Sequence, residues 1–281
     1  MPQIWNSKLS LSLALLSFSV LGACLDGAPE ASSSQPPASL AEAEHAVSKQ
    51  PGGDVAITAM PTAGLHLWLR SDAGINPIGA PPHAANQVSR WIDQSGAGRN
   101  ASMATAARQP TFVPGALNGW PVLRFGGAQS MYLDFFASPT LFTVFIVGKN
   151  SNPAESFSMI LGPGGNAANN QLRWENGSSA LFVGTGNNLP VITSSIGNTR
   201  VYHALSARYN GSSMTVYRDG NPTSSHPFVT SGPWVLASVG SWYSSYFLRG
   251  DLAEVIVYDR ALTEAERLDV NQYLRSKYAL P

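Results

Sequence analysis

Short apolar stretches separated by glycine, asparagine and proline dominate the chain from residue 61 onward. The run at 141–147, LFTVFIV, is almost continuously apolar and rich in β-branched residues, which is typical of a central strand buried on both faces. Shorter runs bounded by turn residues also predict strands. These further strands are expected at 64–70, 121–125, 159–161, 172–175, 179–183, 201–208, 213–218, 234–240 and 252–258.

Two dipeptides between these runs are signals for tight β-hairpins. Asn176-Gly177 and Asn210-Gly211 each separate two predicted strands, and both residue types tolerate the positive φ that a two-residue hairpin turn requires. Asp219-Gly220 ends a strand in the same way. Many short strands joined by such turns predict an all-β fold, namely a two-sheet antiparallel sandwich or jelly roll.

One helix is predicted at the C-terminal end, over residues 263–278. Thr263 and Glu266 have the spacing of a capping box, in which each side chain satisfies a backbone N–H of the first turn. Val270, Leu274 and Tyr278 then recur at helical spacing. We expect this apolar side to lie on the sandwich or to cover a sheet edge.

The N-terminus has the order of a secretory signal. Lys8 precedes an uncharged apolar run at 9–21, and Gly22, Ala23 and Cys24 follow at once. Thirteen residues of helix cover about 20 Å, which is short of the roughly 30 Å hydrocarbon core, so a spanning helix is disfavoured. The LGAC sequence at 21–24 resembles a lipobox, which implies cleavage before Cys24 and lipidation of that residue. The alternative is an ordinary secretory cut beside an incidental cysteine.

The segment between this signal and the first predicted strand lacks aromatic residues. Residues 24–60 are rich in Ala, Ser, Pro and Glu, and such a composition predicts a flexible tether, with a short helix at 39–48 as the alternative. The predicted organisation is therefore a signal peptide at 1–23, a tether at 24–60 and one domain at 61–281. In the whole chain, 17 basic side chains balance 17 acidic ones, which gives no reason to expect a nucleic-acid partner.

Four blocks of the domain resemble the laminin-G-like branch of the concanavalin A-like lectin/glucanase superfamily. They are LWLRSDAG at 67–74, VSRWIDQSGAGRNA at 88–101, QP at 109–110 with LNGWPVLRF at 117–125, and GDLAEVIVYDRAL at 250–262. The resemblance implies a two-sheet jelly roll of the concanavalin A-like kind. Members range from sugar-binding lectins to glycan hydrolases, so the resemblance leaves the activity open.

The acid pattern of the superfamily's hydrolases is missing from the sequence. Those enzymes carry acids at alternating positions of one strand, so that the carboxylates share a face. Asp251 and Glu254 are three apart, which predicts opposite faces, and Glu254 is interpreted as tying a strand end to a loop. We therefore predict no catalytic residue.

A structural calcium ion is the one cofactor that the sequence suggests. Asp93 and Ser95 lie in an acidic, glycine-containing loop that resembles a laminin-G calcium loop, and Asp251 and Glu254 are candidates to complete the ligand set. The alternative is a plain turn, in which Asp93 accepts local backbone N–H groups.

Aromatic residues near turns are the candidates for ligand binding. Trp242, Tyr243 and Tyr246 lie between Gly240 and Gly250, and Trp174 lies beside the Asn176-Gly177 turn. Exposed aromatic rings on loops favour recognition, for example of the apolar faces of sugars. The alternative is that these rings cap the ends of the sandwich.

These patterns lead to a hypothesis of a non-catalytic binding protein, held on the cell envelope by lipid and recognising a glycan or glycosylated partner. Leu25 directly follows the cysteine, which under the enteric sorting rule favours the outer membrane. One alternative is a polysaccharide hydrolase or lyase with a displaced acid pair. Another is a structural or adhesion protein that binds proteins.

Overall fold

The computed structural model contains two compact units, Met1–Gly53 and Asp54–Pro281, and the described residues belong to the second. They are 60–75, 86–137, 139–154, 157–163, 171–175, 180–184, 192–227, 229 and 232–281. The predicted signal peptide with Cys24 and most of the predicted tether lie outside the described residues. The same holds for Asn176 and Gly177.

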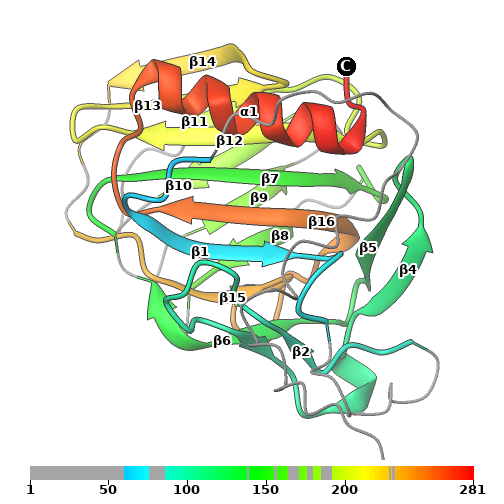
Figure 1. Ribbon diagram of the computed structural model, residues 1–281. Coiled ribbons are helices and arrows are strands. Elements are labelled where there is room, and N and C mark those ends of the chain that lie inside the picture. Colours follow the sequence, from blue (N-terminus) through cyan, green and yellow to red (C-terminus); the bar gives the residue numbers. More distant parts are fainter. Residues whose placement is uncertain are drawn as a thin grey trace, which may run out of the picture. The chain divides into compact units, whose positions relative to one another are not determined.

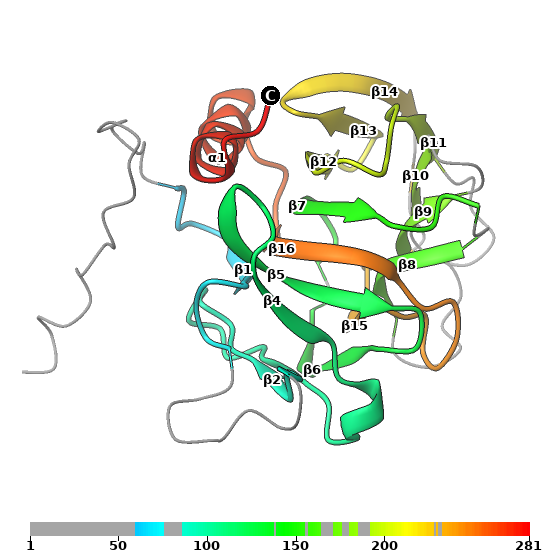
Figure 2. The ribbon, with the colours of Figure 1, turned by 90° about the vertical axis from the view of Figure 1, so that its right-hand side faces the viewer.

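The described strands form two antiparallel sheets, which face each other in Figures 1 and 2. Neighbouring strands of the first sheet are, in order, β14 (Asn221–Pro227), β13 (Ser213–Arg218), β12 (His203–Tyr209), β7 (Phe142–Asn150), β16 (Arg249–Tyr258), β5 (Gly119–Gly126) and β4 (Thr111–Gly115). In addition, β1 (Leu65–Arg70) pairs with β16.

The second sheet has the order β11 (Ile192–Ser195), β10 (Ala180–Gly184), β9 (Gln171–Glu175), β8 (Phe157–Gly162), β15 (Leu236–Val239), β6 (Met131–Ala137), β3 (Ala101–Ser102) and β2 (Arg90–Trp91). A short 3-10 helix, η2 (Ala106–Arg108), precedes β4. Two antiparallel sheets made of strands distant in sequence confirm the predicted all-β jelly-roll sandwich.

A hydrophobic core fills the space between the sheets. The stacked rings of Phe142 and Trp234, 4.2 Å apart, belong to it, as does the buried Trp91. A second apolar cluster covers the outer face of the first sheet, where Phe145 and Val147 of β7 take part. Strand β7 is therefore buried on both faces, which explains its nearly continuous apolar sequence and confirms its predicted central place.

The C-terminal helix α1 (Glu264–Tyr278) supplies the other half of that outer cluster. Thr263 is the N-cap, and the predicted capping box with Glu266 is present. Val270, Leu274 and Tyr278 are buried against the first sheet, so the helix lies on a sheet face. Within the described residues, no helix is long and apolar enough to cross a membrane.

Two of the predicted turns lie where the sequence places them. Strands β12 and β13 pair across the Asn210-Gly211 turn. Asp219 and Gly220 have φ values of 51° and 87° and join β13 to β14. Strands β9 and β10 pair as an antiparallel hairpin, as predicted.

The first described residues are fastened to the end of β16. The hydroxyl of Tyr258 donates to the carbonyl of Pro61 at 2.9 Å, and the guanidinium of Arg260 donates to the carbonyl of Ala63 at 2.8 Å. Leu65, the first residue of β1, pairs with Tyr258. The entry of the chain into the domain is thus tied to a central strand.

Candidate functional site

Residues 240–248, which connect β15 to β16, form a tightly turned segment that we call the aromatic loop. Trp242 and Ser245 exchange two backbone hydrogen bonds of 2.9 and 3.0 Å. Gly240 opens the loop with φ of 81°, and a Cβ there would meet the ring of Phe125 at 2.5 Å. As whole residues, Tyr243 and Tyr246 are 50% and 45% exposed. The predicted aromatic loop therefore presents two tyrosine rings to solvent.

Hydrogen bonds fix this loop to strands of the second sheet. The carbonyl of Tyr243 accepts from the Tyr132 hydroxyl of β6 at 2.8 Å and from the Ser241 hydroxyl at 3.0 Å. The carbonyl of Tyr246 accepts from the backbone N–H of Met159 in β8 at 3.1 Å. The loop is thus anchored at both of its exposed tyrosines.

A continuous row of planar groups runs from this loop to β9. The rings of Trp242 and Tyr246 lie 5.4 Å apart, and the ring of Tyr246 meets that of Phe157 edge-on at 5.1 Å. The guanidinium of Arg173 lies 4.3 Å from the centroid of the Phe157 ring. We call Trp242, Tyr246, Phe157 and Arg173 the aromatic row.

Polar side chains of β9 continue this row on the outer face of the second sheet. Arg173 donates to Glu175 at 2.5 Å and to Gln171 at 2.6 Å, which the two-residue period of a strand places on one face. Burial lowers the pKa of the Arg173 guanidinium, although the hydrogen bond to Glu175 acts in the opposite direction. The aromatic row thus ends beside the partly exposed carboxylate of Glu175 and the buried amide of Gln171.

Trp174 does not take part in this site, and its prediction as a ligand-binding residue is wrong. Its side chain is 1% exposed and belongs to the core between the sheets. The alternation of β9 explains this, since Leu172 and Trp174 face inward while Gln171, Arg173 and Glu175 face outward. Sequence reasoning missed Phe157, Arg173 and Tyr132, although the alternation in QLRWE contains the signal for Arg173.

The four predicted calcium ligands are not brought together. Asp93 accepts from the backbone N–H groups of Trp68, Ser95 and Arg99 at 2.9 Å each, and from the Ser95 hydroxyl at 2.8 Å. Both of its carboxylate oxygens are therefore used within the chain, as the alternative turn reading expects. Among the described residues, no group of three or more acidic, histidine or cysteine side chains could hold a metal ion.

Asp251 and Glu254 lie on the same face of β16, which corrects the prediction of opposite faces. The register of β16 against β7 shifts between Leu252 and Glu254, so Ala253 is one extra residue in the strand. This β-bulge reverses the alternation beyond it. Both carboxylates consequently face the side of the first sheet that helix α1 covers.

The two acids nevertheless belong to separate, buried networks. Asp251 accepts from Arg124 at 2.8 and 3.0 Å and from the Tyr202 hydroxyl at 2.6 Å. Burial alone would raise the pKa of Asp251, but these hydrogen bonds lower it below its usual value. Its side chain is fully buried.

Glu254 holds the C-terminal helix to β16. Its carboxylate accepts from Lys277 at 2.8 Å and Tyr278 at 2.7 Å, both on the helix, and from the indole of Trp68 at 2.6 Å. Lys277 also donates to Asp72, just after β1, at 2.9 Å. The interpretation of Glu254 as a structural tie is consistent with this geometry, although its partner is a helix and not a loop.

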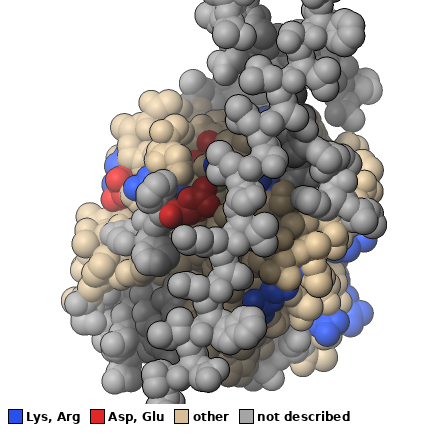
Figure 3. Space-filling view, turned by 90° about the horizontal axis from the view of Figure 1, so that it is seen from below, with Lys and Arg blue, Asp and Glu red and all other residues tan. Residues whose placement is uncertain are grey.

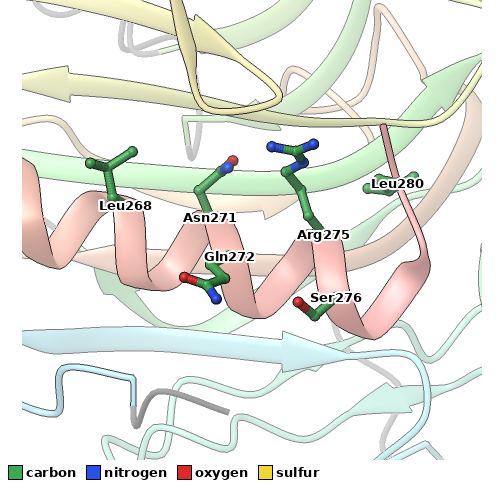
Figure 4. A pocket seen from close by; sticks show the side chains of 6 residues that line it. All are labelled: Leu268, Asn271, Gln272, Arg275, Ser276 and Leu280. Atoms are coloured by element: carbon green, nitrogen blue, oxygen red, sulfur yellow. The ribbon is translucent and has the colours of Figure 1, made fainter. Parts of the chain in front are cut away.

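A surface hollow lies elsewhere, on helix α1. Figure 4 shows the side chains that line it: Leu268, Asn271, Gln272, Arg275, Ser276 and Leu280. Helix α1 and the connection between β15 and β16 lie on opposite sides of the sandwich (Figure 2), so the hollow is not part of the aromatic row.

Figure 3 shows the described charged side chains of the face seen from below. Among the described residues seen in Figure 3, uncharged ones predominate, and the basic and acidic side chains form a few separate groups. Charged residues make up only 12% of the whole chain.

The family described as the concanavalin A-like lectin/glucanases superfamily matches residues 126–266, which is half of the chain. The chain belongs to this superfamily. The match includes Phe157, Arg173 and the aromatic loop. No curated protein matches the chain.

Solved structures share this concanavalin A-like fold at low sequence identity. Trypanosoma rangeli sialidase in complex with sialic acid is 18% identical with a TM-score of 0.53; the match covers 78% of this chain and 34% of the sialidase. Domain 4 of AbnA, a GH43 extracellular arabinanase from Geobacillus stearothermophilus, in complex with arabinotriose, is 16% identical with a TM-score of 0.52; coverage is 75% of this chain and 99% of that domain. The chain spans about a third of the sialidase's length, and these likenesses show the fold alone.

Proposed function

We propose that this protein binds a glycan through the aromatic row and the exposed tyrosines of the aromatic loop. The observation that carries the proposal is that Tyr243 and Tyr246 are about half exposed although hydrogen bonds to their carbonyls fix the loop, and that the ring of Tyr246 contacts Phe157. Rings in such positions offer flat apolar surfaces, which suit the C–H faces of sugars. The complexes of structurally similar proteins with arabinotriose and sialic acid support this ligand class.

The polar end of the row is suited to sugar hydroxyl groups. Glu175 is partly exposed and is an acceptor with further lone pairs, and Arg173 holds it and the buried Gln171 in a fixed arrangement. A sugar stacked on the row would therefore place its hydroxyls near a preorganised carboxylate. Such a mixture of rings and a few placed polar groups is typical of ligand sites.

The positions of Asp251 and Glu254 favour glycan binding without hydrolysis. Retaining and inverting glycosidases need two carboxylates that flank the sugar at an open site. Asp251 and Glu254 share a face, but both are fully buried and engaged by basic side chains and hydroxyls. We therefore assign these two acids to the stability of the first sheet.

A glycan array probed with the full chain tests this proposal. We expect retention of at least one neutral or acidic oligosaccharide, and a loss of at least tenfold in signal for Tyr243→Ala and Tyr246→Ala. Leu268→Ala is the control, because it removes an exposed apolar side chain from helix α1, away from the aromatic loop; Leu268 is 46% exposed. Unchanged retention by both tyrosine variants would contradict the site. Release of reducing sugar from the array ligands would instead favour the enzyme alternative.

We also propose that the domain works on the cell envelope, anchored by lipid at Cys24 and facing its ligand from the outer membrane. The support is the apolar run at 9–21 followed directly by the LGAC sequence. Replacement of Cys24 by Ser should move the protein from the membrane fraction to the soluble fraction. Mass spectrometry of the wild-type N-terminal peptide should show a diacylglyceryl group on Cys24, and an unmodified thiol would refute the anchor.

A further inference from the structure

The aromatic loop is held in a conformation that its residues do not prefer. Tyr243 and Tyr246 have φ values of 55° and 51°, in the left-handed region that bulky side chains rarely adopt. The indole N–H of Trp242 is buried and has no hydrogen-bond partner among the described residues. Each of these features costs free energy, so the loop persists only because its surroundings determine its shape.

Tyr132 supplies the contact that reaches the tip of this loop from a strand. Its hydroxyl donates to the carbonyl of Tyr243 at 2.8 Å. The other hydroxyl that donates a hydrogen bond to this carbonyl belongs to Ser241, which is part of the loop itself. Backbone pairing with Ser102 of β3 and Ser238 of β15 holds Tyr132 in place. The bond from Tyr132 thus links the strained residue to the rigid sheet.

We propose that Tyr132 is a positioning residue, which keeps Tyr243 in its left-handed conformation and thereby holds the loop's rings in the orientation that binds ligand. The inference rests on the proposed glycan-binding function for its purpose, but not for its physical test. A loop that is already ordered in the free protein loses less conformational freedom on binding. Tyr132 therefore acts on affinity without touching the sugar.

Hydrogen exchange in the ligand-free full chain tests the positioning directly. The amides of Trp242 and Ser245 report on the loop because they close its tight turn. Removal of one hydroxyl by Tyr132→Phe should raise their exchange rates roughly threefold to tenfold. Tyr217→Phe, which removes a hydroxyl from β13 of the other sheet, should leave both rates unchanged. Unchanged loop exchange in Tyr132→Phe would overturn the proposal.

The effect of Tyr132→Phe can also be measured in a protein that carries Tyr243→Asn. This comparison separates a role in positioning Tyr243 from a general contribution of Tyr132 to packing. Asn tolerates positive φ far better than Tyr, so Tyr243→Asn should keep the loop in shape without help from Tyr132. In that background, Tyr132→Phe should accelerate loop exchange by less than half as much. An equal acceleration in both backgrounds would refute the role.

Oligosaccharide binding by Tyr132→Phe shows whether the position of the loop affects affinity. Retention of the array oligosaccharide with the highest signal should weaken roughly threefold to tenfold in Tyr132→Phe. If the array retains no oligosaccharide, the proposed function fails, whereas the exchange result still decides the role of Tyr132. If an oligosaccharide is retained equally well by wild type and Tyr132→Phe, the positioning proposal fails and the proposed function stands.

Discussion

Replacement of Glu254 by Gln should destabilise the fold by detaching helix α1 from β16. The substitution keeps the size of the side chain but removes a negative charge that is fully buried. Lys277, whose side chain is only 7% exposed, then keeps Asp72 as its remaining carboxylate partner at 2.9 Å. The amide group also presents a donor to Tyr278 and Trp68, which both donate to the native carboxylate.

The loss of stability in Glu254→Gln can be estimated from these contacts. Removal of one partner from a buried ion pair costs about 3–5 kcal/mol when the other charge is left alone. Because Asp72 still compensates Lys277 in part, we expect a loss of about 2–4 kcal/mol in the free energy of unfolding. For a domain of this size, a loss of 1 kcal/mol lowers Tm by about 2–4 °C, so Tm should fall by roughly 5–15 °C.

Urea denaturation and calorimetry of the full chain measure the two quantities. Asp259→Asn is the matched control, because Asp259 is 46% exposed and faces His66 at 3.5 Å, and exposed pairs are worth less than about 1 kcal/mol. Addition of Lys277→Met to Glu254→Gln should recover part of the loss, since no uncompensated cation remains. A Glu254→Gln variant within about 0.5 kcal/mol of wild type would refute the reasoning.

Three other outcomes are expected. Asp93→Ala should lower the free energy of unfolding by about 2–4 kcal/mol, because three backbone N–H groups lose their acceptor. Millimolar calcium should leave the wild-type Tm unchanged. A calcium-dependent rise in Tm would contradict the assignment of Asp93 to a turn. The hydrogen bond that His203 donates to the carboxylate of Asp219 raises the pKa of His203 above its ordinary value of 6.5. The pair therefore stabilises the fold fully below about pH 6.5 and less as the pH rises through the folded pKa. The destabilisation caused by His203→Gln should therefore be larger near pH 5 than near pH 8, and equal losses at the two pH values in urea denaturation would contradict this. Trp174→Ala should cost about 3–5 kcal/mol as a core truncation, and a cost below about 1 kcal/mol would show that this ring is not in the core.

The fold could be predicted from local patterns because those patterns match the packing. The apolar run that forms β7 is buried on both faces, and the Thr263 capping box begins the helix. The aromatic loop could also be located, because a segment dense in aromatic residues and flanked by Gly240 and Gly250 is typical of a loop between strands.

Some residues were placed wrongly from the sequence, because their positions depend on features that residue spacing alone does not reveal. The face of Glu254 depends on one extra residue, Ala253, which appears only in the register of β16 against β7. Trp174 lies close to the turn predicted at Asn176-Gly177, yet the two-residue period of β9 directs its side chain into the core. Phe157 and Tyr132 join the site through pairing with distant strands, which has no local signal.

The fastening of the domain's first residues to β16 has a mechanical consequence. Suppose that the chain is held at its N-terminal side while the aromatic loop binds a fixed ligand. One force is then applied to β1 at Leu65 and the opposing force is applied to β16 at Arg249. Because Leu65 pairs with Tyr258 at the far end of β16, the two strands are drawn past each other in shear. Ladder bonds perpendicular to both strands then resist the force together instead of opening one at a time. Single-molecule pulling should therefore give a higher unfolding force between Pro61 and the loop than between Pro61 and Pro281, where the helix can peel away first.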